Sequence, residues 1–185
     1  MTILLFGVSN VGKTTIGEKL AQRLGYVFYD LDEEVKKYYD TTLEVFVNMG
    51  TLNERDEKRG RVISAIMENS LDKIIAISPV YYASNFNQHI SGKDVLAIEL
   101  QDFSENIFQR LVFSDENDEK YKDDEYKNLH KKYFISEIKK DLACYKKSFS
   151  KVKNKFHVNN DSIDMVIERI IKEYNLMAIQ NQMSR

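Results

Sequence analysis

The chain has 185 residues, a length that suits one globular domain with a buried core. Its 43% hydrophobic and 30% charged residues are typical of a soluble enzyme. The 29 acidic and 27 basic residues lack the positive balance of a nucleic-acid-binding protein, the single cysteine excludes an intramolecular disulfide, and no apolar run approaches the ~20 residues of a membrane span. We therefore expect a cytoplasmic protein, a monomer or weak dimer, with no nucleic-acid or membrane partner.

The first part of the chain alternates between strand and helix patterns. The short apolar run Ile3–Phe6 predicts a buried parallel strand. From Lys13 onward, apolar residues recur at helical spacing up to Leu24, and Gly25 occupies the position of a helix C-cap. The next predicted elements are a strand at 26–29, helices at 31–38, 43–49 and 52–67, and a strand at 73–78.

The second part continues the alternation. We predict strands at 95–100 and 155–158 and helices at 104–112, 129–149 and 163–175, with Ser104 as an N-cap. Residues 114–128 are almost wholly polar, which predicts a charged, mobile lid segment. Strands separated by helices predict a three-layer α/β/α fold with a mainly parallel, roughly five-stranded sheet. We expect one domain over residues 1–176 and a frayed tail over 177–185.

One motif carries specific chemistry. Residues 7–14, Gly-Val-Ser-Asn-Val-Gly-Lys-Thr, fit the phosphate-binding pattern G-x-x-x-x-G-K-[ST] between a strand and a helix. Its glycines allow the backbone N–H groups to surround an anion at the positive end of a helix. The alternative is a chance glycine turn. The motif predicts nucleoside triphosphate binding, and the residues that we expect to hold the nucleotide are Gly7, Asn10, Val11, Gly12, Lys13, Thr14 and Thr15.

Two residues of this motif have predicted chemical roles. The Lys13 ammonium suits the β- and γ-phosphates, and the Thr14 hydroxyl suits Mg²⁺. A second short motif follows at Asp30-Leu31-Asp32. Two carboxylates separated by one residue at the end of a strand point to the same side, beside the phosphate loop at the edge where open α/β sheets bind ligands. The alternative is that they are ordinary polar residues at a strand end, one of which caps the next helix.

The two motifs together resemble the opening of the shikimate kinase family, in which G-K-[ST]-[ST]-x-G-x-x-L-A precedes a strand that ends in D-x-D. The resemblance is close over residues 3–38. It implies a small P-loop kinase fold similar to that of nucleoside monophosphate kinases, with ATP and Mg²⁺ as cofactors. It also implies that Asp30 supports Mg²⁺ through water and that Asp32 orients or deprotonates the acceptor hydroxyl, so that Lys13 and Asp32 would be the catalytic residues.

Two arginines gain a role from the same resemblance. The stretch Val45–Arg55 resembles the family's I-F-x-x-x-G-E-x-x-F-R, which places Arg55 on the arginine that binds the substrate carboxylate. Arg110 matches the arginine near adenine, where a guanidinium plane stacks on the base. The alternative for both is an ordinary arginine on a solvated helix.

The chain also departs from the family. Ser78-Pro79-Val80-Tyr81-Tyr82 stands where the family has three glycines that line the acceptor pocket with N–H groups. The lid contains no arginine, only Lys120, Lys122 and Lys127, and a lysine lacks the arginine fork. We therefore expect a rebuilt acceptor pocket, and leave open whether a lysine replaces the lid arginine.

The sequence thus predicts a kinase that transfers the γ-phosphoryl group of ATP to a hydroxyl of a small molecule. Shikimate is the leading single candidate for the acceptor. Another polyol, a sugar acid and a nucleotide, taken together, are favoured over shikimate. The alternative from another class is a nucleotide-binding regulatory or interaction module without kinase activity.

Overall fold

The computed structural model describes residues 1–82 and 84–176, and the predicted frayed tail lies outside this part of the chain. The central sheet has five parallel strands in the order β2-β3-β1-β4-β7. The strands are β1 (Thr2–Phe6), β2 (Val27–Asp30), β3 (Lys73–Ala76), β4 (Val95–Gln101) and β7 (Asn154–His157). The predicted α/β class with a parallel sheet is confirmed.

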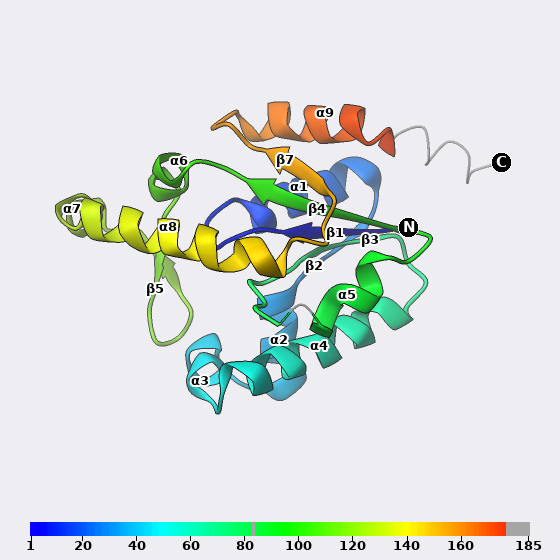
Figure 1. Ribbon diagram of the computed structural model, residues 1–185, viewed down its shortest axis with the longest axis horizontal. Coiled ribbons are helices and arrows are strands. Elements are labelled where there is room, and N and C mark those ends of the chain that lie inside the picture. Colours follow the sequence, from blue (N-terminus) through cyan, green and yellow to red (C-terminus); the bar gives the residue numbers. More distant parts are fainter. Residues whose placement is uncertain (83, 177–185) are drawn as a thin grey trace.

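Helices cover both faces of this sheet (Figure 1). The helices are α1 (Lys13–Leu24), α2 (Leu31–Tyr39), α3 (Leu43–Asn48), α4 (Leu52–Glu68), α5 (Ser84–Ile90), α6 (Ser104–Gln109), α7 (Asp124–Leu129), α8 (Lys131–Ser148) and α9 (Ile163–Glu173). A two-stranded antiparallel hairpin, β5 (Phe113–Ser114) and β6 (Lys120–Tyr121), lies outside the central sheet.

The alternation of side chains along β1 explains the three layers. Ile3 and Leu5 pack into one buried cluster with α1 and α9, whereas Leu4 and Phe6 pack into a second cluster with α2, α4 and α5. Successive residues of a strand point to opposite faces, so one short apolar strand contributes to both cores. All five residues of β1 are buried, as expected for the central strand of a parallel sheet.

The parallel register determines where a site forms. Leu5 pairs with Ala76 and with Ile98, and Asp30 also pairs with Ala76. The carboxyl ends of β1, β2, β3 and β4 therefore meet at one edge of the sheet. The loop after β1 leaves this edge between β3 and β4, at the point where the strand order reverses, which is where open α/β sheets bind ligands.

Several predicted elements need correction. The helix predicted at 104–112 ends at Gln109, and Phe103, not Ser104, is its N-cap residue. The helix predicted at 129–149 corresponds to α8, and a further helix that was not predicted, α7, ends at Leu129 just before it. Helix α5 was not predicted. The lid segment 114–128 contains β6 and most of α7, although its composition predicted no regular structure.

Candidate active site

The loop after β1 has the backbone that its sequence predicts. Gly7 has a φ of 142° and Gly12 a φ of 110°, which an L side chain rarely adopts. A Cβ on Gly7 would lie 2.7 Å from the carbonyl oxygen of Leu100, so only glycine fits between the loop and β4. Asn10 is also left-handed, with a φ of 60°. The loop is thus closed tightly at the N-terminus of α1, where backbone N–H groups attract anions.

Lys13 folds back over this loop. Its Nζ donates hydrogen bonds of 2.9 Å to the carbonyl oxygens of Gly7 and Val8. Burial lowers the pKa of Lys13 to about 8, while Asp32 and Asp30 act in the opposite direction. The ammonium is therefore charged well below this pH and loses its charge as the pH rises through it. Two carbonyls hold the charge at the place where phosphate oxygens would bind.

Thr14 and Asp30 meet at the start of α1. The Thr14 hydroxyl donates a 2.6 Å hydrogen bond to Asp30 Oδ2, and Asp30 Oδ1 accepts from the backbone N–H of Asp32 at 3.0 Å. Asp30 is therefore also the N-cap of α2. One of its two carboxylate oxygens caps this helix, as the alternative interpretation of the sequence expected. The other oxygen, with the Thr14 hydroxyl, forms the kind of hard-oxygen pair that Mg²⁺ prefers, so these residues fit a phosphate-bound magnesium ion.

Asp32 receives a hydrogen bond from a residue that sequence reasoning did not assign. The Ser78 hydroxyl, at the end of the neighbouring strand, donates to Asp32 Oδ1 at 2.6 Å. Arg59 NH2 lies 3.9 Å from the same oxygen. Burial raises the pKa of Asp32, and Ser78 and Arg59 oppose the shift. Within the described residues, Oδ2 accepts no hydrogen bond, so it remains available to an acceptor hydroxyl.

We predict that Ser78→Ala changes the pH dependence of catalysis. Loss of the donated hydrogen bond raises the pKa of Asp32 further, because the bond favours the ionised form. A general base must be ionised to act, so the acidic limb of the kcat profile should move to higher pH. The measurement is kcat against pH for wild type, Ser78→Ala and Ser78→Thr. We expect the threonine variant to retain the wild-type profile, and an unchanged profile in the alanine variant would contradict this role.

The segment after Ser78 is anchored by a buried carboxylate. Asp56 has a fully buried side chain, and its Oδ2 accepts 2.9 Å hydrogen bonds from the backbone N–H groups of Tyr81 and Tyr82. The Ser148 hydroxyl donates to the Tyr81 carbonyl oxygen at 2.6 Å. The backbone that replaces the three glycines is therefore fixed from both sides, and two of its N–H groups are directed toward α4.

Arg55 and Arg59 differ in their environments although both lie on α4. Arg55 NH1 donates to the carbonyl oxygens of Met49 and Gly50, at 3.2 and 3.3 Å. The Arg59 side chain is only 9% exposed and lies 3.5 Å from Asp56 and 3.9 Å from Asp32. Arg59 thus stands beside the candidate base, whereas Arg55 binds the end of α3. The i, i+4 spacing of these arginines was the sequence signal that could have identified Arg59.

Arg110 lies against the phosphate loop. Its Nε donates to the Asn10 carbonyl oxygen at 3.3 Å, and its NH2 donates to Asp102 Oδ2 at 2.6 Å. Burial opposes ionisation of Asp102, but hydrogen bonds from Asn106 and Arg110 outweigh it and hold the pKa of Asp102 below its usual range. A side chain fixed in this way at the mouth of the loop is suited to pack on a nucleotide base.

The lid segment contacts the start of α3. Asp118, at the tip of the β5–β6 hairpin, accepts a 2.8 Å hydrogen bond from the backbone N–H of Leu43. Lys127 is buried and forms an ion pair with Asp124 at 2.7 Å. Its ammonium group therefore already has a partner within α7. Lys120 and Lys122 are exposed, so Lys127 is the only one of the three lid lysines that is buried.

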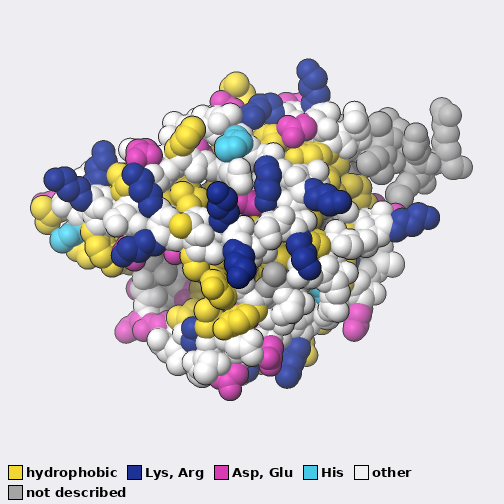
Figure 2. Space-filling view, in the orientation of Figure 1, with side chains coloured by type: hydrophobic (Ala, Val, Ile, Leu, Met, Phe, Trp, Pro, Cys, Tyr) yellow, Lys and Arg dark blue, Asp and Glu magenta, His cyan; other side chains and the backbone are white. Residues whose placement is uncertain are grey.

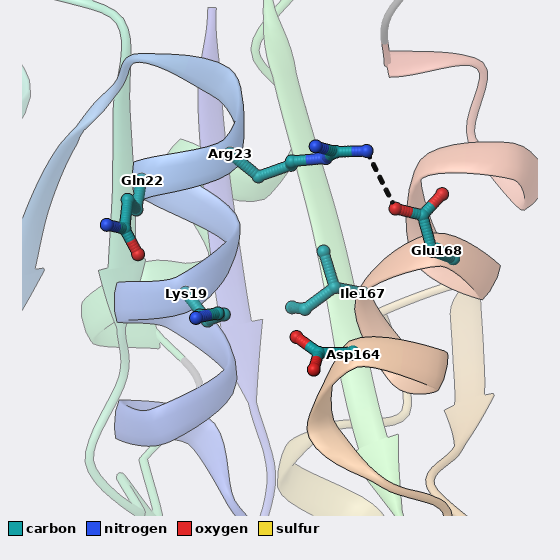
Figure 3. A pocket seen from close by; sticks show the side chains of 6 residues that line it. All are labelled: Lys19, Gln22, Arg23, Asp164, Ile167 and Glu168. Atoms are coloured by element: carbon teal, nitrogen blue, oxygen red, sulfur yellow. Dashed lines mark hydrogen bonds and ion pairs between the residues drawn. The ribbon is translucent and has the colours of Figure 1, made fainter.

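A groove elsewhere on the surface contains none of the predicted site residues. It runs between α1 and α9, and Arg23 and Glu168 form a 2.9 Å ion pair across it (Figure 3). Both side chains are more than half exposed, and such pairs contribute little to stability. Its lining consists of Lys19, Gln22, Arg23, Asp164, Ile167 and Glu168. We therefore place the chemistry at the edge of the sheet and not in this groove.

Two features that the described residues lack bear on other classes of function. No group of three or more His, Cys, Asp or Glu side chains there could hold a metal ion by itself. Magnesium in kinases is commonly bound by one or two side chains together with substrate phosphates, so this result is compatible with the Thr14–Asp30 pair. No described helix is long and apolar enough to cross a membrane.

Comparison with known proteins identifies the family. The family model described as shikimate kinase matches residues 9–175. The chain belongs to the shikimate kinase family. A shikimate kinase of Bacillus pumilus is 30% identical over 116 residues, which are 62% of each chain. One of Novosphingobium aromaticivorans is 41% identical over 66 residues, 35% of this chain and 34% of the relative. The chain thus aligns with less than two thirds of these relatives.

Solved structures of a shikimate kinase and of a gluconokinase share the fold. Shikimate kinase from Bacteroides thetaiotaomicron has a TM-score of 0.73 at 19% identity, covering 95% of this chain and 98% of its own. A gluconokinase from Sinorhizobium meliloti has a TM-score of 0.59 at 13% identity, covering 99% and 95%. The architecture is therefore that of shikimate kinase structures.

Proposed function

We propose that this chain transfers the γ-phosphoryl group of ATP, with Mg²⁺, to a hydroxyl of a small molecule. The observation that carries the proposal is the convergence of three parts at one edge of the sheet. These parts are the Lys13 loop, the Thr14–Asp30 pair and the ionisable Asp32 with its free oxygen. Phosphoryl transfer depends mainly on positioning and charge stabilisation, and this arrangement provides both.

Each residue has a defined part in the proposal. The loop from Gly7 to Thr15 surrounds the phosphates, and Lys13 leaves its two carbonyl partners to bind phosphate oxygens. Thr14 binds the metal directly and Asp30 binds it through water, and the bound Mg²⁺ would neutralise phosphate charge. Arg110 packs against the adenine. Arg55, which is partly exposed, is retained as a contact at the rim of the acceptor pocket.

Asp32 orients the acceptor hydroxyl and accepts its proton through the free Oδ2. The partners that we propose are therefore a nucleotide and a hydroxylated small molecule. We also propose that the protein acts in the cytoplasm. Measurement of ADP formation with and without pooled small alcohols tests the proposal. We expect turnover that requires both Mg²⁺ and an alcohol. Tight ATP binding with no alcohol-dependent turnover would instead favour the regulatory module.

Shikimate remains the leading single candidate, but we predict that it is a poor substrate. Pro79 has no N–H, and the N–H groups of Tyr81 and Tyr82 are bound by Asp56. A polar group that is buried without a partner costs roughly 1–3 kcal/mol, so two such losses weaken binding about a hundredfold. A coupled assay with shikimate measures this. A kcat/KM above ~10⁵ M⁻¹s⁻¹, within the range of working enzymes, would contradict the prediction.

A further inference from the structure

The β5–β6 hairpin of the lid connects the phosphate loop to helix α3. Its first strand begins three residues after Arg110, whose Nε donates to the Asn10 carbonyl oxygen at 3.3 Å. At its tip, Asp118 Oδ2 accepts the backbone N–H of Leu43, the first residue of α3, at 2.8 Å. Figure 1 shows the hairpin running from the end of α6 toward α3. One short hairpin therefore contacts the candidate site at two separate places.

The tip contact holds a short helix at its start. Helix α3 has six residues, and Phe46 is the one among them that is buried. Helices of this length are marginal by themselves, so contacts at their ends matter for their position. The Thr42 hydroxyl accepts the N–H of Val45 within the helix. Asp118 accepts the N–H of Leu43, one of the donors that have no partner inside a helix. A carboxylate at this end also interacts favourably with the helix dipole.

The charges around the tip favour the same contact. Lys36 Nζ of α2 lies 3.8 Å from Asp118 Oδ2, and the Asp118 side chain is only 13% exposed. The other acids of the turn, Asp115, Glu116 and Glu119, are exposed. Figure 2 shows Lys and Arg side chains spread over the outer face that α8 crosses and Asp and Glu side chains beside the hairpin. Asp118 is therefore the acid of an acidic turn that is directed toward α2 and α3.

Phe46 connects α3 to the candidate base. The Arg59 guanidinium lies over its ring, with 5.0 Å between Cζ and the ring centroid, a cation–π contact. Arg59 NH2 lies 3.9 Å from Asp32 Oδ1, and NH1 lies 3.5 Å from Asp56 Oδ1. Within the described residues this guanidinium makes no hydrogen bond, and its Nε is buried without a partner. Arg59 is thus held beside Asp32 by the Phe46 ring and by charge, without a directional bond.

We propose that Asp118 is a positioning residue for phosphoryl transfer, because it holds the start of α3 and thereby fixes the Phe46 ring that supports Arg59 beside Asp32. The inference rests on the proposed kinase activity. Buried side chains pack closely and move little without their neighbours, so a displacement of α3 reaches the guanidinium through the ring. The tip of the lid thus acts on the surroundings of the candidate base without contacting the base itself.

Two substitutions at one position separate the carboxylate from the turn. Asp118 has a φ of 64°, which glycine and asparagine both accept. Asp118→Gly therefore retains the turn and removes the acceptor, whereas Asp118→Asn retains an oxygen that can cap the helix. Asn117→Gly is the matched control, because Asn117 is exposed and bonded only through its backbone N–H to Asp115 among the described residues. It adds a glycine to the same turn and leaves the contact with α3 in place.

The first readout is the geometry, which needs no acceptor. Nuclear magnetic resonance of the full chain follows the Leu43 amide and the Arg59 Nε–H, whose chemical shift depends on the Phe46 ring. In Asp118→Gly we expect the amide to exchange at least ~3-fold faster, on the scale of one lost hydrogen bond, and the Arg59 signal to move. Asp118→Asn and Asn117→Gly should resemble the wild type. An unchanged Arg59 signal in Asp118→Gly, or the same shift in Asn117→Gly, would overturn the proposal.

The second readout is the reaction with Mg·ATP and pooled alcohols that include hydroxy acids. At low concentration of the pool, transfer should fall at least ~3-fold in Asp118→Gly and be retained in Asp118→Asn. The KM for ATP should change less than ~2-fold, because Asp118 lies at the opposite end of the hairpin from Arg110. A general loosening of the lid would raise this KM as well and would contradict the proposal, as would unchanged transfer. No transfer by the wild type would overturn the kinase proposal and with it this role of Asp118, and the resonance readout distinguishes that failure from a failure of the positioning.

Discussion

Lys13→Ala is expected to abolish phosphoryl transfer and to weaken ATP binding strongly while the fold is retained. Lys13 is half-buried, and its ammonium contacts only loop carbonyls among the described residues, so its removal leaves no cavity in either core. In the proposed function this charge would bind the β- and γ-phosphates. Calorimetric titration with Mg·ATP measures the affinity, and far-UV circular dichroism checks the fold.

The alanine variant has a matched control on the same helix. Lys19→Ala removes an exposed lysine of α1 that lines the groove in Figure 3, and it should bind ATP as the wild type does. Equal affinity in wild type and Lys13→Ala would count decisively against the phosphate-binding role of the loop.

Asp32→Asn is expected to lower kcat by at least ~10²-fold, the usual scale of general acid–base catalysis. The amide retains the shape of the side chain and can still accept a hydrogen bond from Ser78, but it no longer accepts a proton. ATP affinity should change little, because in the proposed function Asp32 contacts the acceptor and not the phosphates. Steady-state kinetics with the true acceptor provides the measurement.

A variant of the neighbouring carboxylate, that of Asp30, distinguishes metal binding from proton transfer. Asp30→Asn should mainly raise the magnesium concentration required for half-maximal rate, because Asp30 pairs with Thr14 and not with the acceptor pocket. Full activity of Asp32→Asn on the true substrate would show that another group, or no group, takes the proton.

The parts of the fold that were predictable depend on local sequence. The apolar strand before Gly7 and the helical spacing after Lys13 fix β1 and α1 without reference to distant residues. Helix α5 has the sequence SNFNQHI, with Phe86 as its one buried residue. Such a helix has no helical repeat of apolar residues to detect, and it is held by packing against α4 and β4.

The structure of the lid was also not predictable from the local sequence. Its hairpin is closed by Asp118 in a left-handed conformation, a turn role that asparagine and aspartate accept. Its other support is an aromatic cluster in which Phe113 contacts the rings of Tyr121, Tyr126 and Phe134. These contacts join residues that the sequence separates by a run of charges, so composition alone indicated no structure.

The candidate site was also predictable only in part. The phosphate loop and Asp30 were accessible to motif reasoning, because their spacing along the chain is the signal. The Ser78–Asp32 bond and the Arg59–Asp32 pair join the start of α2 to the segment after β3 and to α4. These contacts depend on the register of the sheet and on the packing of α4, which no local pattern records.

The most direct test of the kinase assignment follows the terminal phosphate itself. The chain would be incubated with ATP labelled in the γ-phosphate, with Mg²⁺ and with pooled alcohols that include hydroxy acids, and the label would be located by chromatography and mass spectrometry. We predict that it appears in a phosphate monoester of an alcohol, and that Lys13→Ala and magnesium removal abolish this product. Label that remains in ATP, or that appears only as inorganic phosphate, would contradict the assignment.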